Sequence, residues 1–264
     1  MPPWMLLVLF GALSGALGGL MGVGGGVILV PLLVHAQRRT QHEAHGTSLA
    51  FIIVTSIVAG ASYLRAQHLD VALAGQLALG AVFGVLLGAR IARGMTAQRL
   101  RRAFGIVVLL VAVRILALPP HPVPGGALWS PPWEVLLGAG VGVLAGLLGV
   151  GGGTILVPIL VLLQRVDQHT AQGVSLLMII PTALVGAWRY ARHGHLVPGM
   201  LPPLMAGGAA GALLGASLAH SINTPMLSRL FALFLLPVGA QMVWSRPRRS
   251  ATVPGSTGPM GGST

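Results

Sequence analysis

Long apolar runs separated by short polar segments make up most of this chain. A helix needs about 20 largely apolar residues to cross the hydrocarbon core of a bilayer, and several runs reach or approach that length. They are Trp4–Val34, Gly46–Leu64, Val71–Ala89, Ala103–Leu118, Val135–Leu163, Ala171–Trp188, Leu196–Ala219 and Leu230–Trp244. The pattern predicts an all-α polytopic membrane protein with about eight to ten helical segments.

The first run, Trp4–Val34, holds 31 residues without a charge or a histidine, which is more than one straight span requires. It either crosses once, or enters and returns as two helices or a re-entrant hairpin. A second arm over about residues 27–36 is too short to span a bilayer alone. The opening MPPWMLLVLF lacks the basic flank of a secretory signal, so we expect it to belong to a retained helix.

Comparison of the chain with itself shows an internal duplication. Shifted by 127 residues, Gly19–Val34 (GLMGVGGGVILVPLLV) lies on Gly146–Val161 (GLLGVGGGTILVPILV) with 13 identities in 16 positions. The match continues without a gap through pairs that include His42/His169, Ser48/Ser175, Thr55/Thr182, Tyr63/Tyr190, Arg65/Arg192 and His68/His195. We expect a first transmembrane repeat at 1–118, a Pro/Gly-rich linker at 119–132, a second repeat at 133–245 and a basic, then disordered, tail at 246–264.

The number of crossings in each repeat decides how the two repeats are oriented. Four crossings make them parallel, and the sixteen arginines then divide nine to seven between the two sides. An odd number makes them inverted and leaves only four arginines on one side, which are Arg65, Arg114, Arg165 and Arg229. The positive-inside rule favours this twelve-to-four division. We therefore expect inverted-topology repeats in the cell (inner) membrane, with both termini in the cytoplasm.

Composition excludes several classes of function. Hydrophobic residues make up 54% of the chain and charged residues 8%, with a mean hydropathy of +0.84, whereas a soluble domain has roughly 25% charged residues. The chain has no cysteine, no lysine and only four acidic residues, which argues against thiolate metal sites, Walker-type phosphate loops and paired-carboxylate catalysis. The net charge of +12 comes from arginines that punctuate apolar runs, a pattern that indicates topology and not nucleic-acid binding. We expect no enzymatic activity, no cofactor and no metal.

Each repeat carries the motif G-x-G-G-G-x-x-x-x-P, at Gly22–Pro31 and at Gly149–Pro158. Three consecutive glycines interrupt a helix, and unwound backbone at membrane depth is tolerated only inside protein or beside a watery cavity. A helix that restarts after the break points unpaired N–H groups and the positive end of its dipole at the break, which suits an anion. Secondary transporters bind substrate at such broken helices near the midplane. The glycines expected to bind substrate are Gly22, Gly24, Gly25, Gly26, Gly149, Gly151, Gly152 and Gly153.

Polar residues of the following segments are further candidates. Ser48 and Ser175 lie in the first turns of the next predicted helices and would donate hydrogen bonds to anion oxygens; alternatively they are caps or packing hydroxyls. His42 and His169 precede those helices and would bind substrate and couple protons, because histidine titrates near physiological pH; alternatively they are interfacial loop residues. The glycines also have a plainer interpretation, in which they only allow tight turns or close helix packing.

The glycine motifs, followed by HEAHGTSLAF in the first repeat and HTAQGVSLLM in the second, resemble the sulfite exporter TauE/SafE family, also called the toluene sulfonate uptake permease family. The resemblance covers roughly residues 4–244. It implies a carrier of sulfite, an organosulfonate or a related small anion, and it does not fix the substrate. It also implies a substrate contact at Thr47, although the second repeat has Val174 at the matching position.

These features predict a secondary membrane transporter of a small anion, with sulfite or an organosulfur anion as the favoured substrate and alternating access as the mechanism. The alternative is an anion channel of the same architecture, or a carrier of an unrelated small anion. The predicted partners are the small anion and the lipid bilayer, with no nucleic acid.

Overall fold

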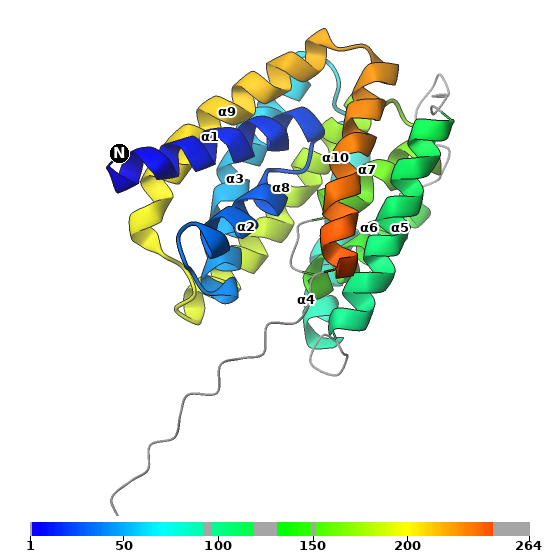
Figure 1. Cartoon of the computed structure of the whole chain (residues 1–264). Coiled ribbons are helices and arrows are strands. Elements are labelled where there is room, and N and C mark those ends of the chain that lie inside the picture. Colours follow the sequence, from blue (N-terminus) through cyan, green and yellow to red (C-terminus); the bar gives the residue numbers. More distant parts are fainter. Residues whose placement is uncertain (1, 92–96, 119–130, 149–151, 245–264) are drawn as a thin grey trace, which may run out of the picture.

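The computed structural model describes residues 2–91, 97–118, 131–148 and 152–244 (Figure 1). Gly149 and Gly151, most of the predicted linker and the predicted tail lie outside these ranges. The described residues form ten α-helices and one short 3₁₀ helix, and none of them forms a strand. The helices are α1 (Pro3–Met21), α2 (Gly26–His35), α3 (Gln41–Arg65), α4 (Val71–Ile91), α5 (Ala97–Ala117), α6 (Pro131–Leu148), α7 (Gly153–Leu162), α8 (Gln168–Arg192), α9 (Leu201–Ser221) and α10 (Thr224–Trp244), with the 3₁₀ helix η1 (Pro198–Met200) leading into α9. The predicted all-helical class is confirmed.

The helix boundaries repeat with the same offset as the sequence. Adding 127 to the bounds of α2, α3 and α5 gives the bounds of α7, α8 and α10, and the matches of α1 with α6 and of α4 with η1 and α9 differ only at the ends. Each repeat therefore contains five helices. Pro131 and Pro132, at the end of the predicted linker, belong to the first turn of α6, where proline needs no amide donor.

Among the described residues, six helical segments contain a stretch long and apolar enough to cross a membrane. They are α1, α3, α4, α8, α10 and the combined segment of η1 and α9. The helices α2 and α7 have ten residues each, which gives them a length of about 15 Å, roughly half the hydrocarbon thickness. The apolar run Trp4–Val34 is thus divided into one full-length helix and one half-length helix.

Glycines allow two pairs of helices to pack backbone against backbone. On α1, a side chain at Gly11, Gly15 or Gly19 would overlap the backbone of Leu204, Gly208 or Ala212 on α9, respectively. The contact advances in the same direction along both helices, so α1 and α9 run parallel. In the repeat-related pair, Gly80, Gly84 and Gly88 of α4 lie on the α6 backbone in the same way. Each repeat therefore contributes its first helix to a pair with the fourth helix of the other repeat.

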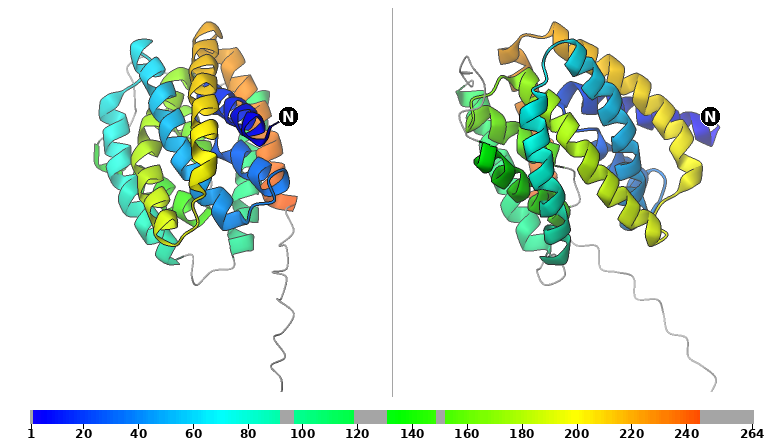
Figure 2. Two further views of the ribbon diagram at one scale, coloured as in Figure 1. Left: turned by 90° about the vertical axis from the view of Figure 1, so that its left-hand side faces the viewer. Right: turned by 180° about the vertical axis from the view of Figure 1, so that it is seen from behind.

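The third helices of the two repeats, α3 and α8, pack against each other in the middle of the molecule. The α1–α9 pair flanks them on one side and α5 and α10 lie on the other (Figures 1 and 2). His42 at the start of α3 stacks on His195 just after the end of α8, and His68 just after α3 stacks on His169 at the start of α8. The two helices are therefore antiparallel.

Candidate functional site

The first helix break, residues 22–25, is a tight turn that only glycine adopts readily. Gly22 ends α1 with φ +70°, and Gly24 and Gly25 follow with φ +72° and +85°. Side chains at positive φ are strained, so these positions require glycine for the backbone itself. Gly25 packs on the backbone of Ser14, and Gly18 packs on that of Gly25. The chain thus folds back against α1 before α2 begins.

Both half-length helices begin with amides that have no backbone acceptor in the described part of the chain. In α2, the amides of Ile28 and Leu29 donate to the carbonyl of Gly25, which leaves those of Gly26 and Val27 unpaired, as the geometry of a helix start requires. In α7, Ile155 and Leu156 donate to Gly152 in the same way. The amides of Gly153 and Thr154 then have no backbone acceptor among the described residues. All four of these residues are buried.

The first break touches the start of α7. A Cβ on Gly153, the first residue of α7, would lie 2.9 Å from the Cα of Val23, in the middle of the first break. In the first break itself, a Cβ on Gly22 would overlap the side chain of Gln172 on α8. The starts of the two half-length helices, 127 residues apart in sequence, are therefore neighbours in the interior of the protein.

One serine hydroxyl faces the start of each half-length helix. The Oγ of Ser48 on α3 lies 2.9 Å from the position of a Cβ on Gly26, and the Oγ of Ser175 on α8 lies 2.9 Å from that on Gly153. The serines are 2% and 0% exposed, and neither hydroxyl has a hydrogen-bond partner among the described residues. Each serine lies seven residues after the first residue of its helix, about 10 Å along the axis. A buried hydroxyl without a partner is costly, so this pair points to a missing acceptor.

Three further polar side chains that the sequence did not single out for the site surround the first break. Thr55 donates from its hydroxyl to the carbonyl of Gly24 at 2.8 Å and fixes the turn. Ser56 has a buried Oγ without a partner among the described residues, 2.9 Å from the position of a Cβ on Gly24. The Oε1 of Gln172 accepts from the Tyr63 hydroxyl at 2.7 Å, which leaves its buried Nε2 as a free donor within the described structure.

These three residues differ in whether the sequence could have revealed them. Thr55 has a repeat partner in Thr182, which is a signal of a shared structural task. Ser56 matches Ala183 and Gln172 matches His45. Self-comparison could not find those two positions, because the site is less symmetric than the glycine motif.

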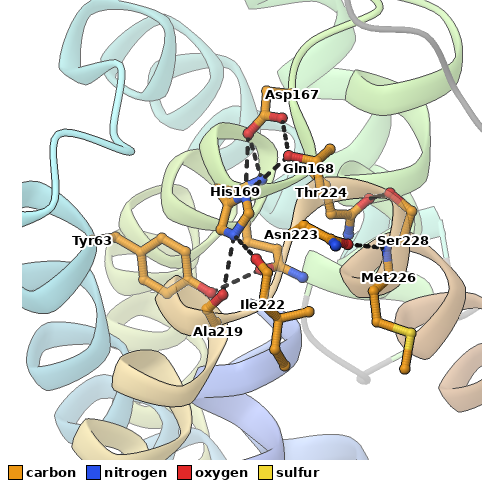
Figure 3. A network of polar contacts seen from close by, with 11 residues as sticks. Tyr63, Asp167, Gln168, His169, Ala219, Ile222, Asn223, Thr224, Met226 and Ser228 are labelled. Atoms are coloured by element: carbon orange, nitrogen blue, oxygen red, sulfur yellow. Dashed lines mark hydrogen bonds and ion pairs between the residues drawn. The ribbon is translucent and has the colours of Figure 1, made fainter.

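The structure places the two predicted histidines and Thr47 away from the breaks. His42 is exposed and stacks on His195, with ring centroids 5.1 Å apart. His169 is buried, and its Nε2 lies 3.0 and 3.1 Å from the carbonyls of Ala219 and Ile222 (Figure 3). Thr47 accepts from the amide of Val197 at 3.3 Å. Of the predicted site residues that the structure describes, the glycines and the two serines come together and these three do not.

His169 belongs to a polar cluster at the start of α8, which is composed of Asp167, His169, His68, His220 and Thr224. Asp167 caps α8, and its carboxylate lies 3.3 Å from Nδ1 of His169 and accepts from the Thr224 hydroxyl at 2.8 Å. Burial raises the pKa of Asp167, but the hydrogen bonds from His169 and Thr224 outweigh it and bring this pKa down to about 2. The cluster ties α8 to the ends of α3, α9 and α10.

No group of three or more histidine, aspartate or glutamate side chains able to hold a metal ion occurs among the described residues. The donors at the two breaks are amides and hydroxyls, whose chemistry suits an anion and not a cation.

Comparison with known proteins gives a family match over most of the chain. The sequence model of the sulfite exporter TauE/SafE family matches residues 1–115 and 133–263. The chain belongs to this family. The match is interrupted only around the predicted linker, and it contains both glycine motifs.

Relatives of similar length are named as membrane transporters. "Probable membrane transporter protein YunE" of Bacillus subtilis is 25% identical over 266 residues, covering 91% of this chain and 97% of that protein. A "Probable membrane transporter protein" of Xylella fastidiosa is 29% identical over 245 residues, covering 89% and 92%. No solved structure gives a significant match. The family and the six candidate spans indicate a multi-pass membrane transporter and not an enzyme.

Proposed function

We propose that this protein is a secondary transporter that carries a small anion, with sulfite or an organosulfur anion as its substrate, through a site formed by the two helix breaks. The observation that carries the proposal is the pair of buried serine hydroxyls, Ser48 and Ser175, each facing the start of a half-length helix without a partner among the described residues. An oxyanion would accept hydrogen bonds from both hydroxyls and from the free helix amides. The family name supplies the sulfur chemistry.

Inverted repeats are part of this proposal, because alternating access around a central site is commonly built on them. Two features support inversion. Five helices per repeat, of which the second is half-length and turns back at the break, give an odd number of crossings. The repeat-related helices α3 and α8 run antiparallel, as equivalent helices of inverted halves must. We propose that the arginine-rich side, with both termini, faces the cytoplasm.

The test is transport of labelled sulfite into liposomes that contain the purified protein, with Ser48→Ala and Ser175→Ala as variants. Removing one hydroxyl that bonds a charged group costs about 1.5–3 kcal/mol, so each variant should bind about tenfold more weakly or worse. Folding stability without anion should stay the same or rise, because the hydroxyl that is removed has no partner among the described residues. This combination separates a binding role from a structural one.

Ser221→Ala is the matched control. Ser221 is exposed at the end of α9 and donates to the carbonyl of Ser217, so its removal should leave transport unchanged. The proposal fails if the protein does not carry sulfite or any organosulfonate. The site assignment alone fails if the protein transports such an anion and both serine variants keep the parental affinity.

A further inference from the structure

The described donors at the starts of α2 and α7 are nearly neutral as a set. The chain has no lysine, and no arginine side chain that the structure describes is buried. The donors that lie against these helix starts and the first break are the hydroxyls of Ser48, Ser56 and Ser175 and the first amides of α2 and α7. The site therefore attracts an anion without a fixed cationic side chain from the described part of the protein.

The positive charge available at the site is about one elementary charge. The N-terminus of a helix carries about half an elementary charge, and two such termini meet where Gly153 lies on Val23. Their sum matches one negative charge. Both termini face polar groups inside the protein. The Ser48 hydroxyl lies against Gly26, the first residue of α2, and the Ser175 hydroxyl lies against Gly153, the first residue of α7.

A second negative charge on the anion raises the desolvation cost by more than it strengthens the attraction to the two helix starts. The cost of removing an ion from water scales with the square of its charge, so a dianion pays about four times as much as a monoanion of equal size. Its attraction to a fixed charge scales only with the first power, and about doubles. With a fixed charge of about one unit, the desolvation cost grows faster than the attraction.

We infer that the paired starts of α2 and α7 select a singly charged oxyanion over a doubly charged oxyanion of the same size and shape. This inference rests on the proposed anion site and narrows its substrate to a class. Among sulfur anions, bisulfite and organic monosulfonates belong to the favoured class, and sulfite dianion, sulfate and disulfonates do not. Because sulfite takes up a proton near neutral pH, its apparent affinity should increase as the pH falls.

The test uses tetrahedral anions that do not titrate near neutral pH. The full-length protein is placed in liposomes, and uptake of labelled methanesulfonate is measured against competing unlabelled salts, with protein-free liposomes as background. Perchlorate and unlabelled methanesulfonate are the monoanions; sulfate and selenate are dianions of similar size. Perchlorate has no methyl group, so it separates recognition of charge from recognition of the methyl group.

We expect both monoanions to compete at concentrations at least about tenfold below those of sulfate and selenate, which corresponds to about 1.4 kcal/mol or more of discrimination. Competition by the dianions at equal or lower concentrations would overturn the charge selection and leave anion transport intact. Transport of neither methanesulfonate nor sulfite would overturn the proposed function itself, and the charge selection with it.

Discussion

At the scale of single residues, the two glycine motifs match in sequence but place different demands on the backbone. Gly25 has φ +85° and lies on the backbone of Ser14, whereas its repeat partner Gly152 has φ −71° and faces the flexible end of Met178. We predict that Gly25→Ala lowers the free energy of unfolding by about 1–3 kcal/mol, and that Gly152→Ala changes it little. Thermal unfolding of the two variants in detergent measures this difference, and equal losses would contradict it.

His68 provides a pH-dependent contribution to stability that can be isolated. Burial first, and then repulsion from His169, hold the pKa of His68 below its ordinary value of 6.5, against a smaller attraction from Asp167. The unfolded chain therefore binds this proton at a higher pH than the folded chain does, and stability falls as the pH drops through about 6.5.

We predict that the parent protein loses more thermal stability between pH 8 and pH 5.5 than the His68→Gln variant, since glutamine does not titrate. Thermal unfolding across this pH range is the measurement. His195→Gln is the repeat-related control, because His195 stacks on the exposed His42 and not on the buried His169. A parallel loss in the parent and in His68→Gln would show that His68 does not contribute.

At the scale of elements, the glycines of α4 have two different roles on one helix. Gly80 lies on the backbone of Val135 in α6, whereas Gly75 is exposed, and a Cβ added to it would have no neighbour within 4 Å. We predict that Gly80→Ala destabilises the protein by about 1–3 kcal/mol through overpacking, and that Gly75→Ala is neutral or stabilises it by about 0.5–1 kcal/mol through reduced backbone freedom. Thermal unfolding tests both, and loss of stability in Gly75→Ala would refute the distinction.

The sequence predicted the elements better than their pairing. Gly22 and the glycines after it mark the break because three glycines cannot continue a helix, and the periodic match at Gly80 and Gly207 indicates equivalent packing faces. Which helix each face meets depends on the three-dimensional arrangement. Spacing along the chain therefore could not predict that α1 packs on α9 of the second repeat, or that α6 packs on α4 of the first repeat.

The candidate site was predictable in the part that repeats. Ser48 and Ser175 share their position relative to a break, and the structure places both hydroxyls over a helix start. The role of Gln172 depends on its contact with Tyr63, 109 residues earlier in the chain, and on its fit against Gly22. Its repeat partner is a histidine. No local pattern encodes such a contact.

At the scale of the whole molecule, the direction of packed helices bears on how the protein lies in the membrane. In the inverted arrangement, α1 crosses the membrane in the same direction as α9, and α4 crosses in the same direction as α6. The helices α3 and α8 cross in opposite directions. The contacts have these directions in all three pairs. They also place the polar cluster around His169 and the stacked pair His42–His195 at opposite ends of the α3–α8 pair.

Cysteine labelling at Arg65 and Arg192 tests this orientation directly, because the chain has no cysteine of its own. The two arginines are repeat partners, both are exposed, and they end the antiparallel helices α3 and α8. In inverted repeats an Arg65→Cys residue faces the outside and an Arg192→Cys residue faces the cytoplasm, where the positive-inside rule places the larger number of arginines. We predict that a membrane-impermeant maleimide added to intact cells labels the first variant only, and that it labels the second after the membrane is opened.

Ser221→Cys, at the end of α9, should behave like the first variant because α9 and α3 end on the same side in this arrangement. Labelling of Arg65→Cys and Arg192→Cys from the same side would make the repeats parallel.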